Sequence, residues 1–215
     1  MGYYCPMSTS EKNSPVFPDP IRVAEHPALD FANTLAAPAG EAVDFILLPE
    51  AFLAWARDTA GTDEVYRLAL EAQKQGDLPD AVIKARALRD WLRALLPRIA
   101  KGDAANDTGI TAELNRILAA GSHHWRLRAQ GNETALALEA MYAGPDSVVA
   151  ALAVLVGRLL TEVSADTVRK CENPACILWF RDTSKRGNRR WCSMGACGNR
   201  AKAAAHRQRR RETED

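Results

Sequence analysis

Four cysteines near the C-terminal end of the chain have the residue type and the spacing of a metal site. Cys171 and Cys176 form one pair, Cys192 and Cys197 form a second, and four residues separate the members of each pair. Fifteen residues lie between the two pairs. Closely spaced thiolates supply edges of the tetrahedron that Zn²⁺ prefers. The pattern therefore predicts one structural zinc ion with four sulfur ligands.

Two other interpretations of these thiols are a redox dithiol pair and four unrelated cysteines. A gap of four residues does not match the Cys-x-x-Cys redox motif, which favours the metal site. Cys5 is far from the other cysteines and is expected to be a free thiol. Lysines and arginines around the predicted site would offset its negative charge and lower the thiol pKa values.

The residues around the cysteines predict the elements that position them. Asn173-Pro174-Ala175 favours a tight turn inside the first pair, and Gly195 in the second can adopt positive φ beside the metal. Residues 177–181 and 189–191 flank a turn-rich segment and are expected to pair as a hairpin. An Ala- and Arg-rich helix follows Cys197. A knuckle, a hairpin and a helix that carries the last ligand are typical of a treble-clef-like zinc finger.

Charge is distributed unevenly along the chain. Residues 169–211 contain thirteen Lys or Arg and two acids, whereas residues 1–168 contain fifteen Lys or Arg and twenty-two acids, although the whole chain has a net charge of +1. A basic end indicates an anionic partner. The expected nucleic-acid contacts are Lys185, Arg186, Arg189, Arg190, Arg200, Lys202, Arg207, Arg210 and Arg211.

A helix over 198–211 would carry its small or neutral side chains on one stripe, formed by Ala201, Ala204, Ala205 and Gln208. We expect this stripe to lie against the finger while the cations face outward. Such a helix fits the major groove of double-stranded DNA. RNA or ribosome binding stays an alternative, although nothing resembles an RNA-stacking platform. Two alternatives remain. The basic residues could form an ordinary solvated surface, or the finger could be an adaptor for a protein partner with a purely structural zinc.

The N-terminal two thirds of the chain predict a mainly helical domain. Apolar periodicity, prolines and glycines indicate helices near 27–35, 49–60, 64–75 and 80–99, the last capped by Asp80 and with Ile83 among its apolar positions. Thr111 is expected to cap a shorter helix, and 43–47 reads as a short strand. Alternation over 125–129 and 134–141 predicts a β-hairpin, and a buried helix is expected over 147–163.

These patterns predict an α+β chain of three parts: a flexible leader (1–20), a helical domain with a small hairpin (21–166) and a zinc finger with a basic C-terminal helix (167–215). The leader lacks the apolar run of a secretory signal, and no segment is apolar and long enough to cross a bilayer. We therefore expect a cytoplasmic protein with no membrane partner, in which clustered cysteines indicate a metal.

Two further candidate sites are weaker. The adjacent pair His123-His124 has no acid or cysteine near it in sequence, so a metal or catalytic role is not favoured. Asp30 and Asn33 lie three residues apart on one helix face and could line a ligand pocket, although bonding to a neighbouring loop is the more frequent role. With no nucleophile–base set, phosphate loop or carboxylate pair, the sequence predicts no enzyme.

A long C-terminal motif resembles the CGNR zinc finger. The matching residues are Cys171, Cys176, Phe180, Asp182-Thr183-Ser184, Arg189-Arg190-Trp191-Cys192-Ser193 and Cys197-Gly198-Asn199-Arg200. Upstream, the segment Leu29-Asp30-Phe31-Ala32-Asn33-Thr34-Leu35 resembles the start of the ABATE domain, which accompanies that finger in bacterial proteins described as stress-induced transcription regulators. The resemblance implies transcription regulation. We further expect, as a hypothesis, that the acidic N-terminal domain senses a small molecule or a protein partner.

Overall fold

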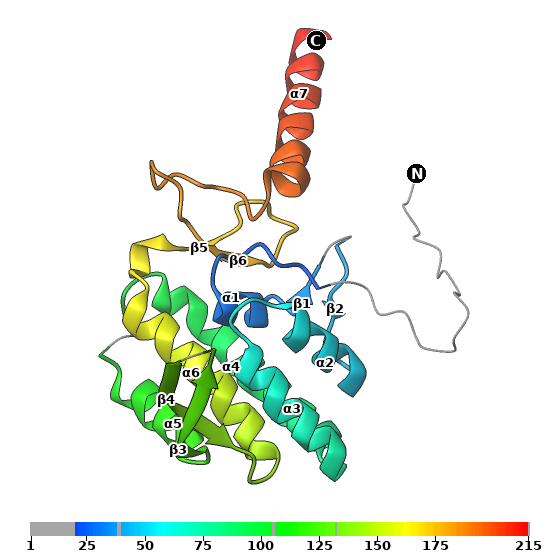
Figure 1. The fold of residues 1–215 in the computed structure, drawn as a ribbon. Helices are drawn as coiled ribbons and strands as arrows, with labels where there is room; N and C mark the ends of the chain where they lie inside the picture. The colour runs from blue at the N-terminus through cyan, green and yellow to red at the C-terminus, as the bar shows by residue number, and fades with distance from the viewer. Residues whose placement is uncertain (1–19, 38–39, 105, 132, 215) are drawn as a thin grey trace, which may run out of the picture.

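The computed structural model describes residues 20–214 except 38, 39, 105 and 132. The predicted leader therefore lies outside the described residues, apart from Pro20. A helical body occupies one end of the molecule and the cysteine-containing module the other, with the last helix projecting beyond it (Figure 1). The elements are, in order, α1 (Pro27–Ala32), β1 (Leu35–Ala36), β2 (Val43–Asp44), α2 (Pro49–Asp58), α3 (Asp63–Gln75), α4 (Leu78–Ile99), α5 (Thr108–Leu118), β3 (Ser122–Gln130), β4 (Glu133–Met141), α6 (Pro145–Glu162), the 3-10 turn η1 (Ala165–Thr167), β5 (Val168–Lys170), β6 (Trp179–Arg181), the π-helical turn η2 (Met194–Gly198) and α7 (Asn199–Glu214).

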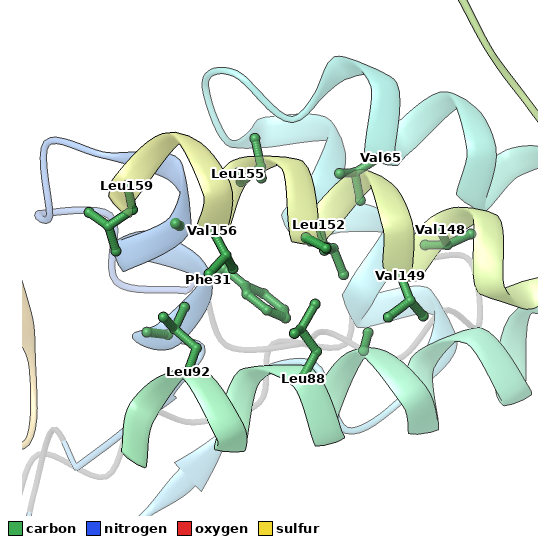
Figure 2. Close-up of a cluster of buried hydrophobic side chains, with 14 of the residues drawn as sticks. Phe31, Val65, Leu88, Leu92, Val148, Val149, Leu152, Leu155, Val156 and Leu159 are labelled. Atoms are coloured by element: carbon green, nitrogen blue, oxygen red, sulfur yellow. The ribbon is translucent and has the colours of Figure 1, made fainter. Parts of the chain in front are cut away.

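Helix α6 is the central element of the hydrophobic core. Its Leu152, Val156 and Leu159 are fully buried, and they pack with Phe31 of α1 and Leu92 of α4 (Figure 2). Each such side chain contributes roughly 2 kcal/mol by leaving water. The prediction of a buried helix here is confirmed. Among the described residues, no helix is both long and apolar enough to cross a membrane.

Two predicted helix starts are wrong. Helix α4 begins at Leu78 after Asp77, and Asp80 lies inside its first turn, because Pro79 lacks an amide hydrogen and favours the first turn. Helix α5 is capped by Asp107, four residues before the expected Thr111, and the Oδ1 atom of Asp107 accepts a hydrogen bond from the Ile110 amide at 2.9 Å. Ile83 of α4 is 62% exposed, so it does not share the buried face.

The predicted β-hairpin is confirmed. Strands β3 and β4 pair antiparallel from Ser122 opposite Met141 to Gln130 opposite Glu133. At its base, the Ala140 amide donates to Glu64 at 2.8 Å, and Arg67 donates to the Ala140 carbonyl. This pair of α3 side chains thus holds the edge of β4 in the place of a third strand.

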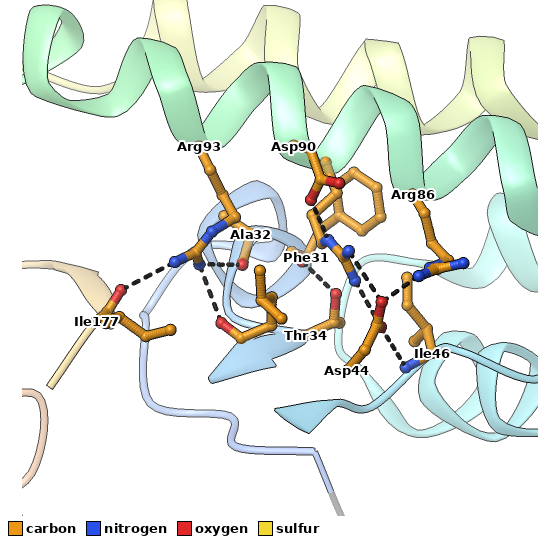
Figure 3. A network of polar contacts seen from close by, with 11 residues as sticks. Phe31, Ala32, Thr34, Asp44, Ile46, Arg86, Asp90, Arg93 and Ile177 are labelled. Atoms are coloured by element: carbon orange, nitrogen blue, oxygen red, sulfur yellow. Dashed lines mark hydrogen bonds and ion pairs between the residues drawn. The ribbon is translucent and has the colours of Figure 1, made fainter. Parts of the chain in front are cut away.

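The short strands β1 and β2 are fixed on α4 by a carboxylate (Figure 3). Asp44 accepts hydrogen bonds from Arg89 at 2.6 and 3.0 Å and from Arg86 at 2.8 Å. The Arg89 side chain is only 2% exposed, so its charge needs this partner. These arginines hold the pKa of Asp44 below its ordinary value, against the opposing effect of its burial.

Candidate metal centre and basic surface

The structure brings the four predicted cysteines together. Their sulfur atoms all lie within 4.8 Å of one another, and each cysteine is buried. The sulfur of Cys192 lies 3.8 Å from that of Cys176 and 3.6 Å from that of Cys197. A tetrahedron with Zn–S bonds of 2.3 Å has edges of about 3.8 Å, so the sulfur arrangement fits this ion.

Each ligand comes from a different local structure. Cys171 follows β5, and Cys176 ends a tight turn closed by its amide, which donates to the Asn173 carbonyl at 2.8 Å. Cys192 lies in a bend before the extended Ser193, and Cys197 is carried by the turn η2. Side-chain and backbone donors also reach the sulfurs: Asn173 Nδ2 lies 3.3 Å from the sulfur of Cys197. Such outer donors orient metal ligands.

The thiols influence one another electrostatically. A hydrogen bond with Cys192 lowers the pKa of Cys176 to about 5. The same bond, together with burial, raises the pKa of Cys192, and burial raises the pKa of Cys171. One thiolate is therefore easily formed, while the next ones require a cation beside them, which is the charge that a bound metal supplies.

Gly198 lies close to the side chains of two neighbouring residues. A Cβ atom at this position would lie 2.7 Å from the Met194 sulfur and 3.2 Å from Trp191. The Gly198 amide donates to the Ser193 carbonyl at 3.0 Å, which closes the turn that carries Cys197. Gly195 is not among the residues with positive φ, so that prediction is wrong. The space beside Gly198 is thus occupied by the side chains of Met194 and Trp191.

The predicted hairpin between the two cysteine pairs is also wrong. Strand β6 pairs with β5, which precedes the first cysteine, with Arg169 opposite Phe180. Residues 189–191 form no strand; the Arg189 amide donates to Asp182 and the Arg190 carbonyl accepts from Glu172. In this arrangement Phe180 is fully buried in the cluster that contains the four cysteines, Ala36 and Phe45.

Asp182 shapes the basic loop, a role that was not predicted from the sequence. Its Oδ1 accepts from the amide and the hydroxyl of Ser184 at 3.0 and 2.6 Å, and its Oδ2 accepts from the Arg189 amide at 2.8 Å. The buried carboxylate thereby closes the loop at both ends. The Asp-Thr-Ser sequence, which is typical of a turn formed by an aspartate side chain, could have indicated this role.

The expected nucleic-acid residues divide into two groups. Lys185, Arg186 and Arg190 in the loop are exposed, as are the helix residues Arg200, Lys202, Arg207 and Arg210. Arg190 pairs with Glu172 at 2.6 Å on the surface. The side chain of Arg211 lies outside the described residues. The loop and α7 lie at the same end of the molecule (Figure 1).

Arg189 points inward instead. Its guanidinium donates to the Cys192 carbonyl at 2.5 Å and to the Val23 carbonyl at 2.8 Å, and it lies 4.3 Å from the centre of the Phe180 ring. These contacts join the second cysteine pair to the N-terminal segment. The structure therefore gives Arg189 a role in folding.

Helix α7 does not pack with its alanine stripe. Only Ala201 is partly buried, and Ala204, Ala205 and Gln208 are exposed. The helix projects from the finger after its first turn (Figure 1). Since alanine is the best helix former, these residues keep an unsupported helix intact without filling an interface.

Asp30 and Asn33, the predicted pocket residues, bond to backbone. Asp30 accepts from the amides of Val23 and Ala24 at 3.1 and 3.2 Å. The Asn33 amide group donates to the Trp179 carbonyl at 2.7 Å and accepts from its amide at 3.0 Å. Asn33 thus extends the edge of β6, and the loop-bonding interpretation is the one that the contacts support.

Further contacts join the finger to the helical body. Arg93 of α4 donates to the carbonyls of Ala32 and Leu35 at 2.7 and 3.0 Å and to Ile177 at 3.4 Å (Figure 3). A second hydrophobic cluster contains the four cysteines, Leu178 and Phe180 of the finger together with Ala36 and Phe45 of the N-terminal part. The finger therefore shares its core with the preceding domain.

Comparison with protein families agrees with this architecture. The family model described as "CGNR zinc finger" matches residues 167–210, and the model described as "Putative stress-induced transcription regulator", the ABATE domain, matches residues 25–166. A search of curated proteins gives no match. The chain belongs to the ABATE family and carries a CGNR zinc finger at its C-terminal end.

Proposed function

We propose that this protein is a cytoplasmic transcription regulator, without enzymatic activity, which binds double-stranded DNA through the basic surface of its finger. A structural Zn²⁺ held by Cys171, Cys176, Cys192 and Cys197 keeps that surface in shape. The observation that carries the proposal is the exposure of cations on two adjoining segments, the 185–190 loop and α7, while no acid occurs from Thr183 to Arg211.

Neighbouring basic residues of the loop differ in their exposure, and this difference supports the proposal. Arg189 stabilises the loop from inside, while Lys185 and Arg186 face solvent at its tip. Helix α7 has a width that suits the major groove and a projecting position that leaves its sides accessible. Phosphate neutralisation by these side chains would supply most of the affinity.

The experiment is fluorescence anisotropy with duplex DNA and with single-stranded and duplex RNA over a salt series. For DNA binding, the affinity should fall steeply with salt, and each phosphate contact removed should make the slope of log K against log salt shallower by about 0.9. Arg186→Ala and Arg207→Ala should weaken binding while zinc stays bound. Arg116→Ala, an exposed arginine of α5, is the matched control.

Two other results would replace this function. A clear preference for RNA would assign the finger to RNA, and slopes near zero for both nucleic acids would leave a protein-interaction adaptor. Loss of zinc in Arg186→Ala or Arg207→Ala would show that these arginines act in folding.

A further inference from the structure

A cavity of about 550 Å³ lies between the β3–β4 hairpin and the helical body. Its volume is in the range of small-molecule sites. One wall is the hairpin and the other is a single face of α6, which presents residues at the spacing of successive helical turns from Ser147 to Arg158. Nothing in the family descriptions assigns a role to this cavity.

The cavity has an apolar floor on α6, and an exposed arginine lies at one end of that helix face. Ala150 and Leu155 are buried, and Val154 is partly buried, whereas Arg158 at the end of the same helix face is exposed. Val65 of α3 adds to the apolar surface. A molecule that lies along α6 would therefore place its apolar part on the floor and its end group beside Arg158.

The acids of the cavity wall are already neutralised. Glu64 is hydrogen-bonded to Arg67 at 2.7 and 2.9 Å, and Glu139 is hydrogen-bonded to Arg128 at 2.5 Å. These arginines hold the pKa values of both carboxyl groups below their ordinary values, although burial opposes the effect at Glu64. Within the described part of the chain, Arg158 makes no ion pair. Its positive charge is therefore available to an anionic group of a ligand.

We propose that this cavity binds a small amphipathic organic anion, with its apolar body on α6 and its anionic group on Arg158. The inference deepens the proposed regulatory function, because α6 leads through η1 directly to β5 and the first cysteine. Binding to the cavity is measured without DNA, so either proposal can fail while the other stands.

The test uses the fluorescence of 8-anilinonaphthalene-1-sulfonate on the full chain, with octanoate and octylammonium as competitors of equal length and opposite charge. Octanoate should displace the dye, and octylammonium should not. Arg158→Gln should weaken octanoate binding by about tenfold or more, as expected for loss of a charge-assisted hydrogen bond. The exposed-arginine control Arg116→Gln should leave binding unchanged.

Val154→Trp should fill the cavity and abolish binding of both dye and octanoate. Ala151→Phe is the second filling variant, and circular dichroism identifies which of the two remains folded. Equal octanoate binding by Arg158→Gln and by the native chain, or binding retained in a folded filling variant, would overturn the proposal.

The hairpin also exposes Trp125 and Leu127, at 66% and 69%, on a surface outside the lining of the cavity. Trp125→Gln should leave octanoate binding intact. If this variant removes the binding instead, the ligand lies on the outer surface and the cavity is not the site.

Discussion

The two hydrophobic clusters of the molecule obtain their stability in different ways. The large cluster around α6 contains complete helices whose Leu, Val and Phe side chains bury one another. The small cluster consists of four cysteines, Leu178 and Phe180, and it takes Ala36 and Phe45 from the neighbouring domain. A module of this size buries too little apolar surface to fold alone. The finger therefore shares the core of its neighbour, and the proposed metal ion would supply the remaining stability.

The largest effect should come from removing one metal ligand. Cys192→Ser should abolish stoichiometric zinc binding and unfold the finger, since metal binding and folding are a single process in such modules. The helical body should keep most of its far-ultraviolet circular dichroism. Metal analysis and a thermal melt measure the two outcomes. Cys5→Ser is the matched control and should retain the zinc; an ordered finger in metal-free Cys192→Ser would contradict the comparison.

The second effect concerns the contact between the clusters. Asn33→Ala removes both hydrogen bonds to the backbone of Trp179 and leaves buried groups without partners, which should cost about 3 kcal/mol. Urea unfolding of the zinc-loaded chain measures this loss. Asn188→Ala in the exposed basic loop should change stability by less than about 0.5 kcal/mol. Equal stability of the two variants would show that the finger does not depend on its neighbour.

The third effect separates two arginines of one loop. Arg189→Gln should lower stability by about 2 kcal/mol, because it loses hydrogen bonds to the Val23 and Cys192 carbonyls. Arg186→Gln should leave the melting temperature unchanged and weaken only DNA binding. Thermal melts and anisotropy titrations of both variants provide the measurement. The reverse assignment of the two effects would exclude Arg189 as a structural residue.

Structural features that depend on a few neighbouring residues could be predicted from the sequence better than features that depend on tertiary contacts. The cluster of four cysteines was predictable because paired cysteines with short gaps have few other uses. The β3–β4 hairpin was predictable because alternation over nine-residue strands is a strong local pattern. Helix caps were less predictable than the cysteine cluster or the hairpin. Asp77 and Asp80 are the same residue type three positions apart, and the choice between them depends on whether Pro79 lies in the first turn of the helix.

Features decided by tertiary contact were not predictable. Strands β5 and β6 have three residues each, too few for a periodic pattern, and the pairing of β6 depends on where Phe180 is buried. Arg186 and Arg189 are identical in type and share one loop, so only the position of the N-terminal segment distinguishes them. The alanines of α7 form a stripe in a helical projection of the sequence. Ala204 and Ala205 are nevertheless exposed, because the helix projects from the finger.

The smallest predicted effect tests how the N-terminal segment is attached to the large cluster. Burial raises the pKa of Asp30 to about 6, although the amides of Ala24 and Val23 oppose this shift. The folded chain therefore binds a proton near pH 6 that the unfolded chain does not, and the contribution of Asp30 to stability falls as pH rises through that value. Between pH 5.5 and 7.5, the loss should be about 1 kcal/mol.

Asp30→Asn has no such titration, so the free energy of unfolding of the variant, relative to the native chain, should increase by this amount over the interval. Urea unfolding at both pH values measures the difference. Both values lie above the pH range in which protons displace zinc from thiolates. An equal change of stability with pH in the two proteins would mean that Asp30 is ionised throughout and that its two hydrogen bonds outweigh its burial.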